Sequence, residues 1–203
     1  MRLILVRHGQ TAWHAESRHV GNADIPLDDT GKEQARRVAK HLAGTDIDAA
    51  FSSPLSRCLE TARLVAEPHG LPVVTDGRLR EMDMGEWSGE TYEAVAEKYG
   101  DIISCWTRDP GSLTPPGGEA LEKVRERTLS WLEEAWEDYR WKNLLVSSHS
   151  TPIRVIVSDL IGIPFNRMFC LSLAPASITT ITYNGELANL EVLNDTCHLA
   201  GRG

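Results

Sequence analysis

Apolar residues follow two patterns along this chain: short continuous runs, and stripes with helical spacing. The first run, Leu3 to Val6, stops at Arg7-His8-Gly9 and predicts a buried strand that ends there. Similar runs recur toward the carboxyl terminus, where Asn184-Gly185 joins the last two as a hairpin. The predicted strands are residues 3–6, 49–52, 72–75, 144–149, 178–183 and 187–193.

Stripes with a spacing of three and four residues predict helices between these runs. Thr30 and Glu33 form a capping-box pattern, which opens a helix that should end at Gly44. Pro54 is expected at the first position of the next helix. Further helices are predicted over residues 91–106, 119–136 and 152–161.

The order of these elements determines the expected fold class. Strands alternate with helices before the final hairpin, which indicates a mixed sheet covered on both faces. We expect an α/β fold, a three-layer α/β/α sandwich with a mixed, mostly parallel sheet. Residues 1–203 should form a single domain, with a helical cap inserted at about residues 82–140. The polar stretch over residues 12–29 is expected to be a long loop of the kind that carries function.

Composition and charge exclude several classes of protein. Hydrophobic residues make up 41% and charged residues 25%, as in ordinary globular proteins. The formal net charge of -8 disfavours binding to nucleic acid or to an anionic membrane. The four cysteines have no zinc-site spacing, so we expect reduced thiols and no structural metal. No apolar run is long enough for a signal peptide or a membrane span, and a cytoplasmic protein is expected.

Charged and imidazole side chains stand where the predicted strands end. Arg7 and His8 follow the first strand, and His149 ends a later strand in the same way. Ligands of open α/β sheets bind at the carboxyl ends of the strands, so these side chains should meet in one crevice. Arg57 is expected in the first turn of a helix that begins at the same edge. Such a cluster suits a phosphoryl dianion, because arginine offers permanently charged forks to phosphate oxygens.

The same residue types suggest a chemistry. A neutral imidazole nitrogen can attack phosphorus and form a phosphohistidine, which makes His8 a candidate nucleophile. Glu81 lies in a segment where acids alternate with apolar residues and glycines, and it is the candidate proton donor to the leaving alkoxide.

Four segments in this order resemble the histidine phosphatase superfamily, also called phosphoglycerate mutase-like. They are Leu5-Val6-Arg7-His8-Gly9-Gln10-Thr11, Ser52-Ser53-Pro54-Leu55-Ser56-Arg57-Cys58-Leu59-Glu60-Thr61-Ala62, Leu79-Arg80-Glu81-Met82-Asp83-Met84-Gly85 and Val146-Ser147-Ser148-His149. The resemblance implies that His8 is the nucleophile and that Glu81 is the acid and later the base. It implies that Arg7, Arg57 and His149 bind the phosphoryl group. It implies no metal and no organic cofactor.

Further candidates surround these five residues. His14 stands where many relatives have a phosphate-contacting asparagine, and Gly21 and Asn22 match a loop that approaches the substrate in relatives. Ser148, which directly precedes His149, completes the predicted substrate-binding set.

The branch of the family is less sharply indicated. The segment Asn194-Asp195-Thr196-Cys197-His198-Leu199 is similar to metal-independent phosphoserine phosphatases and α-ribazole phosphatases. Met84 departs from the phosphoserine enzymes, which have a histidine there. The expected function is a phosphomonoesterase acting on a small phosphorylated metabolite, either phosphoserine-like or α-ribazole phosphate-like.

Other readings stay open. The main alternative is a cofactor-dependent phosphoglycerate mutase. A catalytically silent binding protein and a metal hydrolase using His8, His149, Glu81 and Asp83 rank lower. The family's tendency to dimerise makes a homodimer a candidate assembly by analogy.

Overall fold

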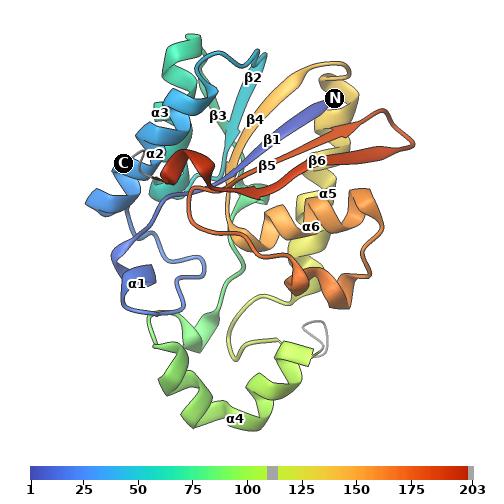
Figure 1. Ribbon diagram of the computed structural model, residues 1–203. Coiled ribbons are helices and arrows are strands. Elements are labelled where there is room, and N and C mark those ends of the chain that lie inside the picture. The colour runs from blue at the N-terminus through green and yellow to red at the C-terminus, as the bar shows by residue number, and fades with distance from the viewer. Residues whose placement is uncertain (109–113, 201–203) are drawn as a thin grey trace.

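The computed structural model describes residues 1–108 and 114–200 and has one mixed sheet (Figure 1). The strand order is β3-β2-β4-β1-β5-β6. The first four of these run parallel to one another, and β5 and β6 pair antiparallel at one edge. The strands are β1 Arg2–Arg7, β2 Ala49–Ser52, β3 Val73–Thr75, β4 Asn143–Ser148, β5 Ile178–Tyr183 and β6 Ala188–Asp195.

Strand β1 lies in the middle of the sheet, between β4 and β5. Its side chains alternate between two cores, as the pleat of a strand requires. Leu3 and Leu5 contribute to one hydrophobic cluster, whereas Ile4 and Val6 contribute to the other. All four are at most 1% exposed, because helices cover both faces. The continuous apolar run therefore reflects burial on two sides.

Two pairs of helices make the outer layers. Helices α2 (Asp29–Leu42) and α3 (Ser56–Ala66) pack on the face of Ile4 and Val6. Helices α5 (Leu121–Asp138) and α6 (Ser150–Ile161) pack on the face of Leu3 and Leu5. Figure 1 shows the two pairs on opposite sides of the strands. The expected α/β/α sandwich with a mixed, mostly parallel sheet is confirmed.

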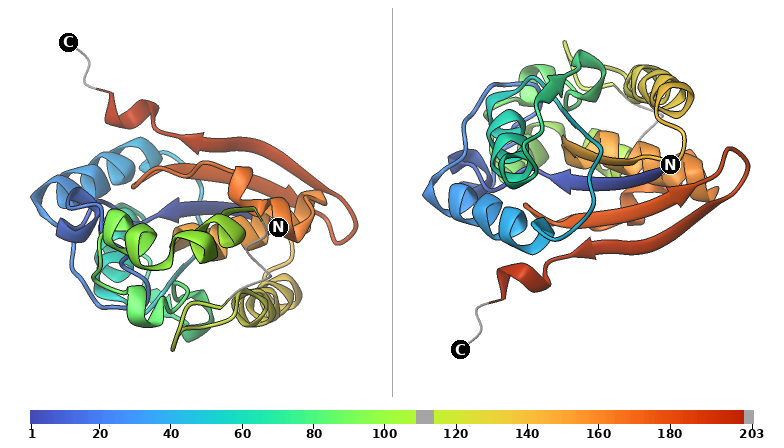
Figure 2. Two further views of the ribbon diagram at one scale, coloured as in Figure 1. Left: turned by 90° about the horizontal axis from the view of Figure 1, so that it is seen from below. Right: turned by 90° about the horizontal axis from the view of Figure 1, so that it is seen from above.

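The edge strand β6 lies on the outside of the molecule in both views of Figure 2. It leads into the short 3₁₀ turn η6 (Cys197–Leu199), which packs against α2. The other 3₁₀ turns are η1 Glu67–His69, η2 Gly77–Leu79, η3 Gly85–Trp87 and η5 Phe165–Cys170.

Helix starts are where the structure departs from the predictions. The N-cap of α2 is Asp28, two residues before the expected Thr30, because the Asp28 side chain accepts a hydrogen bond from the Gly31 amide at 2.7 Å. Helix α3 begins at Ser56, so Pro54 lies outside it and Leu55 is the N-cap residue. The predicted loop over residues 12–29 contains a single turn of helix, α1 (Ala12–Ala15).

The predicted cap segment divides between two places. Helix α4 (Tyr92–Arg108) lies away from the sheet in Figure 1. Helix α5 instead belongs to the sheet's own covering layer, since Trp131, Leu132 and Ala135 are part of the core cluster that contains Leu3. The helical stripe in α5 thus faces the sheet, and the part of the chain outside the layers is narrower than residues 82–140.

Cys58, Cys170 and Cys197 are free thiols, whereas the side chain of Cys105 lies outside the described residues. No helix in the described part of the chain combines the length and the apolar character needed to cross a membrane.

Candidate active site

Two histidines meet at the carboxyl ends of the central strands. His8 follows β1 and His149 follows β4, and these strands are parallel neighbours that pair Arg7 with Ser148. The His8 amide donates to the Ser148 carbonyl at 3.0 Å, which extends the ladder by one step. The two rings meet edge to face with their centroids 5.1 Å apart. The parallel register thus brings together residues far apart in the sequence.

Gly9 allows the backbone of α2 to approach the chain closely just after His8. A Cβ atom at this position would lie 2.4 Å from the carbonyl oxygen of Gly31, which is shorter than any real contact of that kind. The first turn of α2 therefore packs directly on the backbone of residue 9. This close approach holds the His8 ring at the sheet edge, and it requires glycine at position 9.

The hydrogen bonds of His8 determine its tautomer. Nδ1 lies 2.7 Å from the Gly9 carbonyl oxygen, which can only accept, so Nδ1 carries the proton. Nε2 is then left with its lone pair, and it accepts from Nε of Arg57 at 3.3 Å. Burial lowers the pKa of His8 well below 6.5, and the positive charges of Arg57 and Arg7 add to the effect. The ring is consequently neutral at neutral pH, with a lone pair on Nε2.

Arg57 is fully buried and is held by backbone carbonyls. Its Nη1 and Nη2 donate to the carbonyl oxygens of Ala23 and Gly21 at 2.6 and 2.8 Å. The loop after α1 therefore wraps around the guanidinium and aims its Nε at His8. Desolvation is the main cause that lowers the pKa of Arg57, as expected for a buried cation that forms no ion pair among the described residues.

Arg7 and His14 form a second cationic and polar pair. Nη2 of Arg7 donates to Nε2 of His14 at 3.0 Å, so Nδ1 of His14 carries the proton and donates to Oγ1 of Thr11 at 2.9 Å. Burial, together with the charges of Arg7 and Arg57, lowers the pKa of His14 to about 4. A neutral imidazole thus orients Arg7.

Glu81 faces the same space from the loop after η2. Its Oε1 accepts from the Met82 amide at 2.8 Å, and its Oε2 accepts from the Ser150 hydroxyl at 3.1 Å and the Thr151 amide at 3.4 Å. The carboxyl group is thereby tied to the start of α6, directly after His149.

Arg127 on α5 holds this loop by its backbone. Its guanidinium donates to the carbonyl oxygens of Arg78, Arg80 and Glu81 at 2.7, 2.6 and 3.1 Å, and it pairs with Glu119 at 2.8 Å. No signal in the sequence marked this residue, because its role depends on three carbonyl groups that only the folded chain brings together.

A cavity of about 200 Å³ connects His8, the two arginines beside it and Glu81. Six of the predicted residues line it: Arg7, His8, His14, Gly21, Arg57 and Glu81. The sequence analysis did not include eight further lining residues in the site, namely His19, Val20, Met84, Tyr92, Ser150, Thr151, Arg154 and Phe169. The lining thus combines charged and imidazole side chains with the apolar side chains of Val20, Met84 and Phe169.

Comparison with known proteins agrees with this geometry. The model of the histidine phosphatase superfamily (branch 1) matches residues 3–196. The chain belongs to this superfamily. It is 34% identical to Phosphoserine phosphatase 1 of Hydrogenobacter thermophilus, with 98% of this chain and 94% of that protein covered.

Two further proteins with different names are also similar to this chain. The chain is 36% identical to 2,3-bisphosphoglycerate-dependent phosphoglycerate mutase 2 of Gloeobacter violaceus, over 78% of this chain and 74% of that one. The crystal structure of the alpha-ribazole phosphatase from Shigella flexneri superposes with a TM-score of 0.87 at 30% identity, covering 96% of both chains.

Three of the predicted residues of this histidine phosphatase do not line the cavity. Ser148 is fully buried, and its hydroxyl donates to the Leu79 carbonyl at 2.8 Å, so it supports the loop of Glu81. Asn22 lies beside Gly21 but is not part of the lining. His149 is fully buried behind His8, and its Nε2 lies 2.9 Å from the Ser53 hydroxyl. Both Ser148 and His149 stand at the buried end of β4, so neither side chain reaches the cavity.

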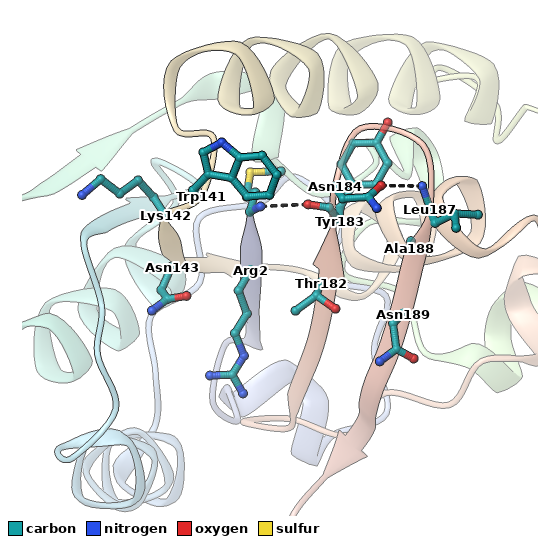
Figure 3. Close-up of a pocket in the computed structure, with 11 residues that line it drawn as sticks. Arg2, Trp141, Lys142, Asn143, Thr182, Tyr183, Asn184, Leu187, Ala188 and Asn189 are labelled. Carbon is teal, nitrogen blue, oxygen red and sulfur yellow. Dashed lines mark hydrogen bonds between the residues drawn. The ribbon is translucent and has the colours of Figure 1, made fainter.

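A wider hollow of about 640 Å³ lies elsewhere on the histidine phosphatase, where Trp141 and Leu187 are exposed (Figure 3). It is lined by Met1, residues of the β5–β6 hairpin and the segment before β4, and it contains neither histidine nor carboxylate. It therefore lacks the groups that phosphoryl chemistry needs.

Metal-type donors gather away from the cavity. Among the residues whose side chains the structure describes, one group has three such donors within 4.8 Å of one another, namely His41, Asp195 and Cys197. Two of them are exposed, and none lines the cavity of His8. His198, next to this group, bonds to the Ala176 carbonyl at 3.0 Å and also stays outside the cavity.

Proposed function

We propose that this histidine phosphatase is a phosphomonoesterase that hydrolyses a small phosphorylated metabolite through a phosphohistidine on His8. The observation that carries the proposal is the tautomer of His8. Its protonated Nδ1 is bonded to the Gly9 carbonyl, and its Nε2 lone pair faces Arg57 in a cavity. The names of phosphatase relatives support the reaction class.

In the first step, Nε2 of His8 attacks phosphorus, and the bond from phosphorus to the ester oxygen breaks. Glu81, protonated at this stage, transfers its proton to the leaving alkoxide, which departs as an alcohol. Arg57 and Arg7 are the cations nearest the nucleophile, and they stabilise the charge on the phosphoryl oxygens. Their planar forks suit oxygens arranged around phosphorus.

In the second step, water attacks the phosphohistidine. Glu81 is now ionised and accepts a proton from the water, and the bond between phosphorus and Nε2 breaks. Inorganic phosphate leaves, and His8 returns to its neutral form while Glu81 is again protonated. His149 lies edge to face against His8 and acts as a support for the ring.

No step of this mechanism uses a metal ion, since arginine side chains supply the positive charge. We also infer a single domain, which the one continuous sheet supports. We infer a cytoplasmic setting as well, which the free thiols support. The net charge of -8 supports a small metabolite as the partner in preference to nucleic acid or a membrane. A homodimer is the assembly to test by light scattering.

The mutase reading remains the second candidate, because a mutase relative is 36% identical over most of the chain. A mutase would return the phosphoryl group of His8 to a substrate hydroxyl in place of water. The two reactions differ in their products: a phosphatase releases inorganic phosphate, whereas a mutase interconverts 2- and 3-phosphoglycerate once a bisphosphoglycerate primer is added.

The test measures phosphate release in excess EDTA from phosphoserine, α-ribazole phosphate, 3-phosphoglycerate and p-nitrophenyl phosphate. Wild-type enzyme should release phosphate, and His8→Ala should lower kcat by about 10⁴-fold or more with an unchanged circular dichroism spectrum. His41→Ala, an exposed histidine on α2, is the matched control. Activity that disappears in EDTA, or that survives in His8→Ala, would overturn the proposal.

A further inference from the structure

Arg154 brings a third arginine to the cavity of His8. It lies in the second turn of α6, and the cavity lining includes it together with Arg7 and Arg57. Its Nε donates to the Leu171 carbonyl at 2.8 Å, and its guanidinium lies over the Phe169 ring, 5.1 Å from the centroid. These two contacts hold the guanidinium plane at the end of the cavity where Tyr92 and Phe169 also contribute.

Arg154 forms no close ion pair within the described part of the chain. None of the ion pairs found there includes Arg154. The bond from Nε to Leu171 is its one hydrogen bond among the described residues, so both terminal NH₂ groups are available to a ligand. Arg154 is half-buried, and this burial is the main cause that lowers its pKa, whereas the charge of Glu81 acts in the opposite direction. A desolvated guanidinium with free donors suits an anion.

Counting charges in the cavity separates this anion from the phosphoryl group. The lining contains three arginines, and Glu81 is its one carboxyl group. In the reaction proposed above, on which this inference rests, Glu81 is protonated when the ester breaks. The phosphoryl dianion then matches Arg7 and Arg57, and the charge of Arg154 is left over. One further negative charge on the substrate would balance it.

We propose that Arg154 binds a carboxylate on the leaving group of the substrate. The preferred substrates are then small phosphate monoesters of hydroxy acids, including hydroxy amino acids. A carboxylate matches the single charge of Arg154 and can accept two parallel hydrogen bonds from its terminal NH₂ groups. Met84 and Val20 also line the cavity and offer apolar contact to a short carbon chain between the two anionic groups.

The test compares substrates that differ only in the carboxylate. One pair is O-phosphoserine and O-phosphoethanolamine, and a second pair without the amine is 3-phosphoglycerate and glycerol 3-phosphate. We expect wild-type kcat/KM to favour the carboxylate member of each pair by about 10-fold to 100-fold. In Arg154→Gln the ratio within each pair should fall toward one, and Arg154→Lys should give an intermediate ratio because it keeps the charge but not the fork.

Arg125→Gln, on an exposed surface of α5, is the control and should keep the wild-type ratios. Calorimetric binding of both members of each pair to His8→Ala and to His8→Ala/Arg154→Gln, with circular dichroism on both proteins, gives the same comparison without turnover. Equal use of both members by the wild type together with equal binding of both by His8→Ala, or a carboxylate preference that survives in both Arg154 variants, would overturn the inference. Absence of phosphate release from every compound, p-nitrophenyl phosphate included, would instead overturn the proposed function, and the binding ratios would still decide the role of Arg154.

Discussion

Nε of Arg57 lies 3.3 Å from Nε2 of His8. This ring nitrogen carries no proton, because the proton is on Nδ1, which donates to the Gly9 carbonyl. The arginine therefore points at the lone pair that would attack phosphorus. Carbonyl groups of Gly21 and Ala23 hold its other end, so the guanidinium needs little reorganisation to face phosphoryl oxygens. Because of this geometry, we expect kcat to fall even when Arg57 is replaced by another cation.

Replacing Arg57 by lysine should lower kcat by about 10²-fold or more, because lysine cannot hold two carbonyl groups and still donate toward the phosphoryl group. Arg63→Lys, an exposed position of the same helix, is the control and should change kcat little. Steady-state kinetics with p-nitrophenyl phosphate measure both. Wild-type kcat in Arg57→Lys would show that charge alone is sufficient at this position.

Removing Arg127 should impair the reaction through Glu81, although Arg127 itself does not line the cavity. We expect Arg127→Ala to lower kcat for alkyl phosphates by about 10-fold to 100-fold. The loss should be smaller for p-nitrophenyl phosphate, because its leaving group needs little help from a proton donor. This contrast separates positioning of the acid from general instability.

The control for this prediction is Arg125→Ala, two residues away on the same helix, where the arginine pairs with Asp159 on an exposed surface. It should affect neither substrate class. Equal losses on alkyl and p-nitrophenyl phosphates in Arg127→Ala would mean that Arg127 stabilises the fold without orienting Glu81.

Gly85→Ala should destabilise the protein strongly. Gly85 has a φ of +51°, and a Cβ atom there would lie 2.2 Å from the Pro116 carbonyl oxygen. Both the backbone strain and the clash disfavour alanine, so the free energy of unfolding should fall by about 2 kcal/mol or more. Gly44→Ala has open space around its Cβ and should stay close to wild type. Denaturant titration compares the two, and similar midpoints would contradict the structure of this turn.

Acid should weaken the fold through His14. The folded protein keeps this ring neutral down to about pH 4, whereas the unfolded chain protonates it near pH 6.5. The stabilisation is complete above pH 6.5 and is lost as the pH falls. At pH 4 the free energy of unfolding has decreased by about 3 kcal/mol. His14→Asn removes this proton from the balance, so its free energy of unfolding should fall less steeply than that of the wild type between pH 6.5 and 4. Parallel curves for the two proteins would contradict the lowered pKa.

His8 and His149 act in the same direction, since burial lowers the pKa of both rings well below 6.5. For the same reason, an NMR titration of the free enzyme should show no midpoint near pH 6.5 for either ring. A midpoint at that pH would show that the ring protonates as an ordinary exposed histidine does.

Much of the fold and the positions of the residues around His8 could be predicted from the sequence, because the signals are local. Four apolar residues before Arg7-His8-Gly9 specify a buried strand and the place where it stops. The same device before His149 specifies a second strand, and parallel strands bring both ends to one sheet edge. Arg57 followed from its place at the start of a helix beside that edge.

The rest depended on tertiary contacts, which local patterns do not encode. Asp28 caps α2 in place of Thr30, because its side chain reaches the Gly31 amide in the folded loop. Ser148 follows the strand pattern, yet the Leu79 carbonyl takes its hydroxyl away from the cavity. Arg154 and Arg127 are ordinary helix residues in the sequence. The Leu171 carbonyl orients the guanidinium of Arg154, and the carbonyl groups of the loop that carries Glu81 orient that of Arg127. Because these carbonyl groups are distant in the chain, only the folded structure decides where the two charges lie.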